Sequence, residues 1–459
     1  MAILDEISGE INYGTVVTNH SEPVFRSVAP QNSATVTLSS TATSGPSEFV
    51  IPPSVFNFSK SRLNFDLSTA LTAASYNNIN ANLLTTISRV VVYDTATNAQ
   101  LLDISSFEKY ASMIASAGTS LTDFLTKSFY SGNIAATIAT SQPVEDIVKL
   151  GTTAANYVLD GTAVGGTTSA DIVAEGGQTQ RRQFFIGGSG AATALRVSIP
   201  LSAFKFTVLA ADKMLYSPSQ LCVQIYWNAT NNFGFITTAN TSVLTGEGVL
   251  GATTITNLSL SLCNEGNLKI VSSVIDRVMK EGLSMPIAYP SITRVSNAAA
   301  TSISTYVPLT RAYGNRILGL VSAIFFNGTY SKANARGRWD LTSYNTFLNN
   351  VAILSQSGFT CNLGRAEDYI LANKDFFKGS ALETAGDYRI AEWVHVDSFK
   401  GRVPLHQWDQ HEIDGLDVGM ATATYSQQFN FSVGVNGVYV TAIIGQKQMT
   451  ITNQGVMVQ

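Results

Sequence analysis

The sequence predicts an all-β protein built from two β-sandwiches in tandem. Three observations carry this prediction. Apolar and polar residues alternate over many short segments, which is the period of a strand with one buried face. Patterns with the period of an amphipathic helix are rare. Similar segments also recur, in the same order, in the two halves of the chain.

The alternation is clearest in the segments 195–201, 258–263 and 438–444, where every second residue is apolar. Each is expected to place one face on a core and the other outward. The runs 89–93 (RVVVY) and 320–326 (LVSAIFF) are apolar almost throughout, which predicts strands buried on both faces. Stretches rich in Gly, Ser, Thr and Asn separate these segments and indicate loops.

Two segments have the helical period. The first has its apolar residues at Ile104, Phe107, Ala111 and Ile114, with Asp103 as the expected cap. The second predicts an amphipathic helix over 267–281 that begins near Asn267 and ends at Gly282. Its apolar residues are Leu268, Val271, Val274, Ile275 and Val278.

The N-terminal residues 1–23 are expected to form an arm. Its first part has apolar residues at Ile3, Leu4, Ile7 and Ile11 and an acidic polar side at Asp5, Glu6 and Glu10. Anionic lipid is a poor target for such a segment. A docking arm or a frayed tail are the two interpretations that fit.

Five pairs of segments match between the two halves. FVIPP (49–53) matches TYVPL (305–309), and NFSKSRLNFDL (57–67) matches NRILGLVSAIF (315–325). The other pairs are RVVVY (89–93) with NVAIL (350–354), FEKY (107–110) with AEDY (366–369), and SIPLSAFK (198–205) with HVDSFK (395–400). The offset falls before the last pair, which predicts a Gly-rich loop insertion around 117–194 in the first copy.

The duplication predicts a first sandwich at 24–266, a linker helix at 267–284 and a second sandwich at 285–459. Antiparallel strands with long connections fit Greek-key topology, and eight strands in two sheets form a jelly roll. A single irregular sandwich with chance similarities is the alternative.

Composition excludes several classes of protein. The chain has 459 residues, 45% hydrophobic and only 13% charged, with a net charge of −4, where about 25% charged is usual. This balance argues against binding nucleic acid through its phosphates. The longest apolar run, 317–326, is about half the ~20 residues of a membrane span, so no transmembrane helix is expected. The acidic N-terminus does not resemble a signal peptide.

No motif for catalysis, for a cofactor or for a metal is recognised, so the expectation for all three is none. The stretch His395–Asp417, with Asp397, His406, Asp409, His411, Glu412 and Asp414, is dense in the residue types that bind cations, but a polar loop after a strand is the favoured interpretation. The three cysteines, Cys222, Cys263 and Cys361, stand far apart and are expected to be reduced, buried thiols.

Two further stretches contain residue types that can form binding sites. GGSG at 187–190 precedes a strand pattern rather than a helix, which favours a plain turn over a phosphate loop. Basic residues gather at 311–338, interleaved with aromatic ones, and a solvated edge with buried aromatics is favoured over a stacking platform. The basic residues are Arg311, Arg316, Lys332, Arg336 and Arg338, and the aromatic ones are Tyr313, Phe325, Phe326 and Tyr330.

Tandem sandwiches joined by a helix, with large insertions in the first, resemble the double jelly-roll major capsid proteins of tailless icosahedral viruses, of the virophage, Polinton-like virus and tailless phage type. Segments 49–67, 256–282 and 343–354 look like corresponding parts of that family. The resemblance covers about residues 48–445 and is one of pattern, without a diagnostic motif.

The resemblance implies a structural protein without enzymatic activity that forms a homotrimer. The trimer would be a pseudo-hexagonal capsomer that tiles an icosahedral shell. Neighbouring capsomers, penton or minor capsid proteins, and an inner membrane reached by the N-terminal arm are the implied partners. The implied location is the virion, assembled inside the host cell, and no direct sequence-specific binding to nucleic acid is implied.

Two other functions remain open. One is a tandem β-sandwich surface or fibre protein that binds glycans or a cell receptor through Trp339, Trp393 and Trp408. The other, less favoured, is a β-sandwich hydrolase that uses carboxylates between Asp409 and Asp417.

Overall fold

Strands dominate the computed structural model, which describes residues 21–69, 75–79, 83–117, 148–149, 158–159, 184–187, 195–238, 252–326, 337–338, 341–352, 359–360, 395–399, 415–419 and 422–459. In this part of the chain the α-helices are α3 (Phe107–Ala117), the single turn α7 (Thr230–Phe233) and α8 (Leu268–Glu281). The predicted all-β class is confirmed.

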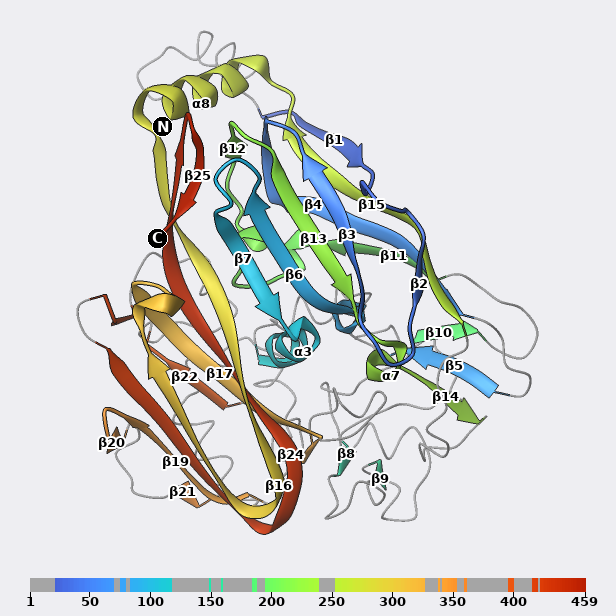
Figure 1. Ribbon diagram of the computed structural model, residues 1–459, viewed down its shortest axis with the longest axis vertical. Coiled ribbons are helices and arrows are strands. Elements are labelled where there is room, and N and C mark those ends of the chain that lie inside the picture. Colours follow the sequence, from blue (N-terminus) through green and yellow to red (C-terminus); the bar gives the residue numbers. More distant parts are fainter. Residues whose placement is uncertain are drawn as a thin grey trace, which may run out of the picture.

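The first half of the chain forms two facing sheets (Figure 1). One has the strand order β1-β15-β4-β11, and the other the order β3-β13-β6-β7. The bounds are β1 (Pro23–Val28), β3 (Ser44–Ile51), β4 (Ser54–Thr69), β6 (Ile87–Asp94), β7 (Gln100–Ser105), β11 (Leu195–Pro200), β13 (Leu221–Trp227) and β15 (Thr253–Glu265). Eight antiparallel strands arranged in this way form a jelly roll.

Short strands extend the first half. β2 (Val36–Leu38) pairs with β15, and β12 (Leu215–Ser217) pairs with β4. β5 (Ser75–Ile79), β10 (Phe184–Gly187) and β14 (Gly234–Thr238) make a separate sheet, as do β8 (Val148–Lys149), β9 (Val158–Leu159) and β18 (Gly337–Arg338).

The second half repeats the same order with fewer, longer strands. β16 (Leu283–Leu309) and β24 (Ala423–Thr452) pair along almost their whole length, and Figure 1 shows both turning back at the lower end of the molecule. β24 has two arms. Residues 437–446 form the arm that pairs with β17 (Arg316–Phe326), and residues 425–431 form the arm that pairs with β19 (Leu341–Leu348). The remaining strands are β20 (Val351–Ala352), β21 (Phe359–Thr360), β22 (His395–Ser398), β23 (Leu416–Asp417) and β25 (Gly455–Val458).

The duplication is visible in the pairing. The order β16-β24-β17-β22 repeats β1-β15-β4-β11, and β16-β24-β19-β20 repeats β3-β13-β6-β7. Strands that are separate in the first half, such as β13 and β15, are therefore continuous in the second half as the two arms of β24. Two tandem jelly rolls, the predicted architecture, are confirmed. The exact boundaries 24–266, 267–284 and 285–459 stay a prediction.

Three of the five matched pairs of segments occupy equivalent strands. FVIPP and TYVPL lie at the ends of β3 and β16, and the second pair lies in β4 and β17. SIPLSAFK begins within β11, and HVDSFK contains β22. The RVVVY match is wrong by one strand, because RVVVY lies in β6, whose equivalent is β19, whereas NVAIL contains β20. AEDY (366–369) lies outside the described residues, as does most of the predicted insertion at 117–194.

One apolar core joins the two jelly rolls. It fills the first between its sheets, with Phe49, Phe65 and Trp227 fully buried, and continues to Phe325 and Ile444 of the second. A second, smaller cluster lies inside the second jelly roll and includes Ile443. Ile443 and Ile444 point to opposite faces of β24, so this strand contributes to both clusters.

Two expectations about individual elements are wrong. The alternation at 438–444 predicted an outward face, yet Tyr439, Thr441 and Ile443 are buried, because the second jelly roll covers that face. The helix expected from Ile104 begins only at Phe107. Asp103, the expected cap, lies in β7 instead and forms an ion pair with Arg89 across the strands. The helix expected over 267–281 is α8.

The C-terminal hairpin is hydrogen-bonded to the first jelly roll. The fully buried carboxylate of Asp94, at the end of β6, accepts the Val456 N–H at 3.0 Å, and Thr97 Oγ1 lies 2.6 Å from the Val456 carbonyl oxygen. Burial raises the pKa of Asp94, but hydrogen bonds from Ser219, Val456 and Thr97 outweigh it and lower the pKa below its usual value. Gly455 has a φ of 132°, and a Cβ there would lie 2.6 Å from the Asp94 carboxylate.

Replacing Asp94 with alanine is therefore expected to destabilise the protein by about 2–4 kcal/mol, because the buried Val456 N–H loses a charged acceptor. Denaturant unfolding measures this change.

The matched control is Asp66→Ala. Asp66 also accepts a hydrogen bond across strands, from Asn257 Nδ2 at 2.8 Å, but on an exposed face. Its loss should cost less than about 1 kcal/mol. Equal losses for the two variants would show that the hairpin is not held by Asp94.

Candidate functional site

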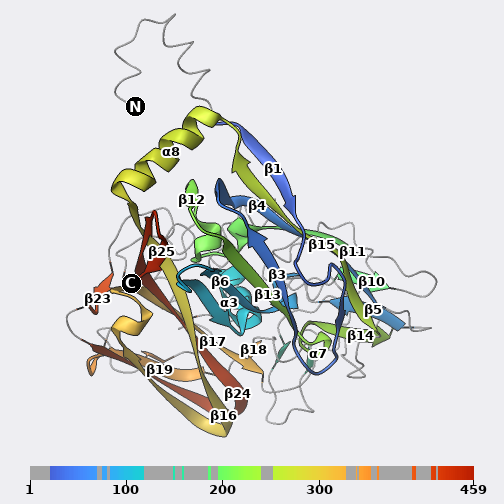
Figure 2. The same ribbon diagram turned by 45° about the horizontal axis from the view of Figure 1, so that its top comes forward.

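The start of the described chain meets the linker helix at one end of the molecule (Figure 2). Glu265, the last residue of β15, joins them: its carboxylate accepts from Ser21 Oγ at 2.6 Å, from the Glu22 N–H at 2.7 Å and from the Asn267 N–H at 2.9 Å. β1 pairs with β15 up to this residue. One carboxylate thus fixes both the entry of the chain into β1 and its exit into α8.

The hydrogen bonds on Glu265 change its acidity. Burial of the carboxyl raises its pKa, but donors from Ser21, Glu22 and Asn267 outweigh that effect and lower the pKa below the usual 4.5. The ionised form is therefore the one that the folded protein favours.

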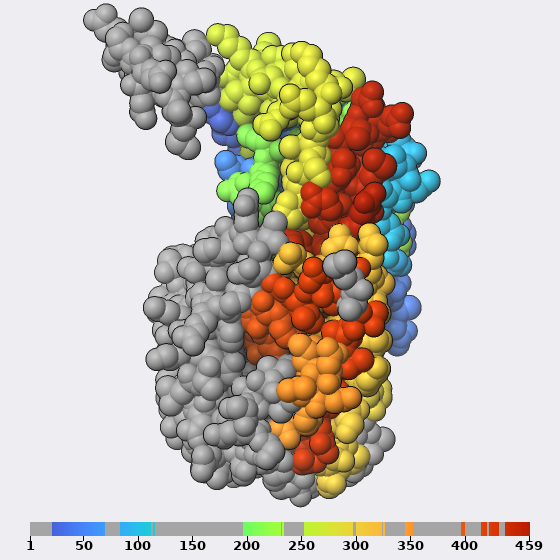
Figure 3. All heavy atoms as spheres, turned by 90° about the vertical axis from the view of Figure 1, so that its left-hand side faces the viewer, coloured from blue at the N-terminus to red at the C-terminus, as the bar shows by residue number. Residues whose placement is uncertain are grey.

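α8 begins and ends with caps that its sequence predicts. The Asn267 side chain accepts the Lys269 N–H at 3.0 Å, and Gly282, with a φ of 72°, donates its N–H to the Val278 carbonyl oxygen. Among the residues of the helix only Val278 is fully buried. Figure 3 shows α8, in yellow-green, as the ridge at the top of this face beside the C-terminal strands.

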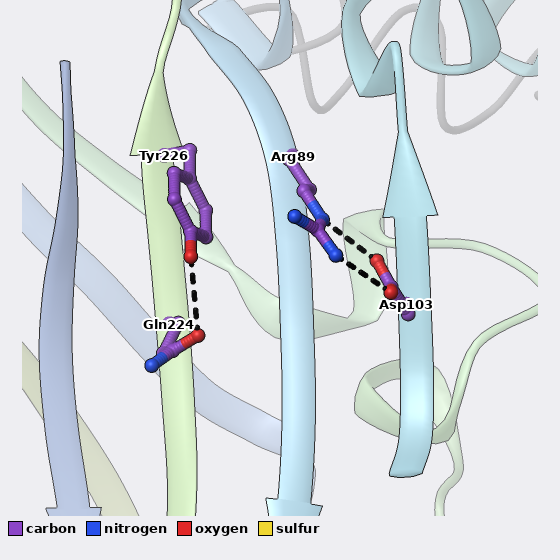
Figure 4. Close-up of polar contacts among 4 residues, drawn as sticks. All are labelled: Arg89, Asp103, Gln224 and Tyr226. Carbon is purple, nitrogen blue, oxygen red and sulfur yellow. Dashed lines mark hydrogen bonds and ion pairs between the residues drawn. The ribbon is translucent and has the colours of Figure 1, made fainter. Parts of the chain in front are cut away.

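A row of polar contacts crosses the outer face of the sheet β3-β13-β6-β7 (Figure 4). Arg89 on β6 binds Asp103 on β7 through both ends of its guanidinium, at 2.8 and 2.7 Å. This hydrogen bonding, against the opposing effect of burial, raises the pKa of Arg89. On β13, Tyr226 lies 5.4 Å from the guanidinium and donates to Gln224, which donates to Glu48 on β3 at 2.6 Å.

A buried polar chain lies inside the second jelly roll. Tyr425 donates to the Asp397 carboxylate, Gln427 donates to Tyr425, and Tyr439 donates to Gln427. Burial raises the pKa of Tyr439. Every group in this chain is bonded to its neighbour within the sandwich, which is the pattern of a structural network.

The structure does not bring together the described part of the stretch His395–Asp417. Asp397 is buried and pairs with Leu320, whereas Asp417 is exposed and pairs with Arg316, about 13 Å further along β17. Within the described ranges, no group of three or more His, Cys, Asp or Glu residues is placed to hold a metal. His406, Asp409, His411, Glu412 and Asp414 lie outside these ranges.

The basic stretch 311–338 is only partly described. Phe325 is buried in the shared core beneath the Lys109 ammonium, and Tyr313 packs on the second cluster, so neither forms a stacking platform. Arg311 is exposed, and Arg316 begins β17. Lys332, Arg336 and Tyr330 lie outside the described part of the chain. Nothing is described of the Arg338 and Phe326 side chains.

Most of the other candidate residues lie outside the described part of the chain. Trp339, Trp393 and Trp408, Cys361 and most of the GGSG turn are among the residues not described. Cys222 and Cys263 are buried free thiols, as expected. None of the described helices is long and apolar enough to cross a membrane.

Sequence reasoning missed Asp94, Glu265 and the pair Arg89–Asp103. All four are charged residues within or at the end of strands. A charged residue in an otherwise apolar strand was the only sign in the sequence that these positions need a partner. Their partners lie in other strands or loops, in the case of Val456 more than 300 residues away in sequence, so no local pattern identifies them.

The comparisons with known proteins give a result at the level of fold. No family model matches the chain, and no curated protein matches its sequence. A chain in the cryo-EM structure of the Sputnik virophage is 11% identical, with a TM-score of 0.52, over 94% of this chain and 89% of that one. This likeness supports the double jelly-roll fold, and the expected resemblance is confirmed at that level.

Two other solved structures are similar over nearly their whole length. The mavirus major capsid protein has 10% identity and a TM-score of 0.47, over 95% of this chain and 90% of that chain. The PBCV-1 virus capsid model has 8% identity and a TM-score of 0.46, over 96% of this chain and 97% of that chain.

The contact between Glu265 and residues 21–22 should depend on pH. Because the folded-state pKa lies below the usual 4.5, the stabilisation from this carboxylate is complete above that value and is lost as the pH falls through the folded pKa. Wild type should exceed Glu265→Gln in melting temperature by a constant amount from about pH 7 to about pH 5. The difference should shrink at lower pH, and a difference that grows with acidification would contradict this assignment.

Proposed function

We propose that the chain is a structural major capsid protein whose homotrimers form the pseudo-hexagonal capsomers of an icosahedral shell. The observation that carries the proposal is the match to a chain of the Sputnik virophage, which extends over 94% of this chain and so includes both jelly rolls and their linker. A match of one sandwich alone would fit many β proteins, because that architecture serves many functions.

The shared core supports this function. Residues from both jelly rolls contribute to one apolar cluster, and the hairpin that ends in β25 is hydrogen-bonded to Asp94. The two jelly rolls are therefore expected to behave as one rigid body rather than as two tethered domains. A shell subunit needs this rigidity, because its neighbours on each side must meet at a fixed angle.

The outer faces of the sheets also suit close assembly. Short polar side chains pair across the strands: Ser68 with Thr254 at 2.9 Å, and Ser198 with Asn64 at 2.7 Å. Side chains that are already paired within one subunit leave fewer unsatisfied polar groups to desolvate, and the exposed Arg62 on this face is itself hydrogen-bonded to Ser198. Charged residues are depleted at the centres of protein interfaces for the same reason, and only 13% of this chain is charged.

In this proposal the chain acts by assembly and not as an enzyme. It would be found in the virion and be assembled in the host cell. Residues 24–266 and 285–459 would be the two jelly rolls, with 267–284 as linker and 117–194 as the loop insertion. Penton proteins, minor capsid proteins and an inner membrane near the arm 1–23 are further proposed partners.

The mass of the purified protein in solution tests the proposal. Light scattering on a sizing column should give a trimer of the 49.0 kDa chain, about 147 kDa, that persists on dilution because obligate interfaces bury on the order of 2,000–5,000 Å². Electron microscopy should then show blocks with a hexagonal outline.

A monomer at 49.0 kDa that forms no particles at high concentration would contradict the capsomer. The alternative of a glycan-binding surface protein would then be tested at Trp339, Trp393 and Trp408.

A further inference from the structure

α8 carries a stripe of apolar side chains that the rest of the described chain does not cover. Leu268 is 80% exposed and Met279 is 50% exposed, while Val271 and Ile275 between them are partly exposed. The spacings of three and four residues place all four on one side of the helix. We call these four residues the α8 stripe.

The edge strand β1, which pairs with the end of β15 just before α8, also carries two exposed apolar side chains, on opposite faces of the strand. Val24 and Phe25 of β1 are 52% and 58% exposed. Val24 touches Gly266, since a Cβ on that glycine would lie 2.8 Å from the Val24 Cγ2 atom. Large exposed apolar side chains that gather in one place mark an interaction surface.

Residues 1–20, which precede the described chain, have the chemistry to bind this surface. They contain Ile3, Leu4, Ile7 and Ile11, and their charged side chains are Asp5, Glu6 and Glu10, without a lysine or arginine. The exposed charges of α8 are mixed, with a net charge of +1. Lys269, Arg277 and Lys280 outnumber Asp276 and Glu281.

The fold also brings this segment to the right place. Ser21 Oγ and the Asn267 N–H bind the same Glu265 carboxylate at 2.6 and 2.9 Å, so residue 20 precedes a point beside the first turn of α8. The helix is about 21 Å long at 1.5 Å per residue. Twenty residues are long enough to reach its far end, since even as a helix they would span about 30 Å, and the short tether gives a high effective concentration.

A second copy of α8 is a poorer occupant of the stripe. Two such helices would bring their excess of basic side chains together. Four side chains on a helix of this length also fall far short of the roughly 800 Å² per partner that stable interfaces bury. A tethered segment needs no such area, because its binding is intramolecular.

We propose that residues 1–20 bind the α8 stripe of their own chain, with Ile3, Leu4 and Ile7 against the apolar side chains and the three acidic residues toward Lys269 and Lys280. This inference does not depend on the capsid function, because it holds for a monomer as well as for a trimer.

Hydrogen exchange followed by mass spectrometry on the full chain tests the proposal. Amides of residues 1–11 should exchange at least about fivefold more slowly than in a free synthetic peptide of residues 1–20. The double variant Leu268→Ser with Met279→Ser should remove this protection. Both side chains are exposed, so the fold should survive, and unchanged protection of β15 amides checks this.

Val351→Ser is the matched control, because Val351 is 69% exposed on β20 and lies outside the stripe. It should leave the protection of residues 1–11 unchanged. Exchange at the free-peptide rate in the wild type would overturn the proposal, and so would equal loss of protection in the control and in the stripe variant.

A disulfide test distinguishes binding of residues 1–20 to their own chain from binding to a neighbouring copy. With Cys361 replaced by serine, Ile7→Cys and Leu268→Cys should form a cross-link under mild oxidation that leaves the denatured mass at 49.0 kDa and blocks alkylation of both new thiols until a reductant is added; thiols that stay open to alkylation would contradict the proposal. A doubled mass would mean that the arm binds a neighbouring copy, and the proposal for the same chain would be wrong.

Discussion

The burial of residues 439–445 of β24 on both faces is the constraint on which the rest of the structure depends. Ile444 packs into the core shared with the first jelly roll, and Ile443 packs into the core of the second. A segment of a strand that is buried on both faces is mostly apolar and must be covered by a layer on each side. The two jelly rolls therefore cannot separate without exposing this strand to water, and the chain behaves as one body.

Continuity of the long strands follows from the same constraint. In the first jelly roll, β1 and β3 are separate strands, as are β13 and β15, whereas β16 and β24 each pass unbroken from one sheet to the other. At the bend the register of the pair shifts between Asn297 and Ser302 of β16, and regular pairing continues on either side without a separate loop. Polar contacts from outside, such as that of Asp94 with Val456, then fix how the last hairpin sits on the first jelly roll.

The end of the molecule near α8 differs from the buried centre, because apolar side chains there are exposed. There Glu265 orders the entry into β1 and the exit into the helix, but the apolar side chains of α8 and β1 remain exposed in the described chain. A subunit with a rigid body and one uncovered apolar end is suited to form further contacts at that end. Because the contact through Glu265 needs its ionised form, its strength is tied to pH in a way that the apolar core is not.

The sequence by itself determined the strand-rich class, the duplication and α8 with both of its caps, because periodicity and capping are local properties of the chain. It also indicated which faces carry apolar residues. Only the tertiary structure decided that the face formed by Tyr439, Thr441 and Ile443 is buried, that Asp103 pairs with Arg89 instead of capping a helix, and that the strand with RVVVY is equivalent to β19. Each of these depends on what another part of the chain places against the residue, and a pattern along one segment contains no information about its distant neighbours.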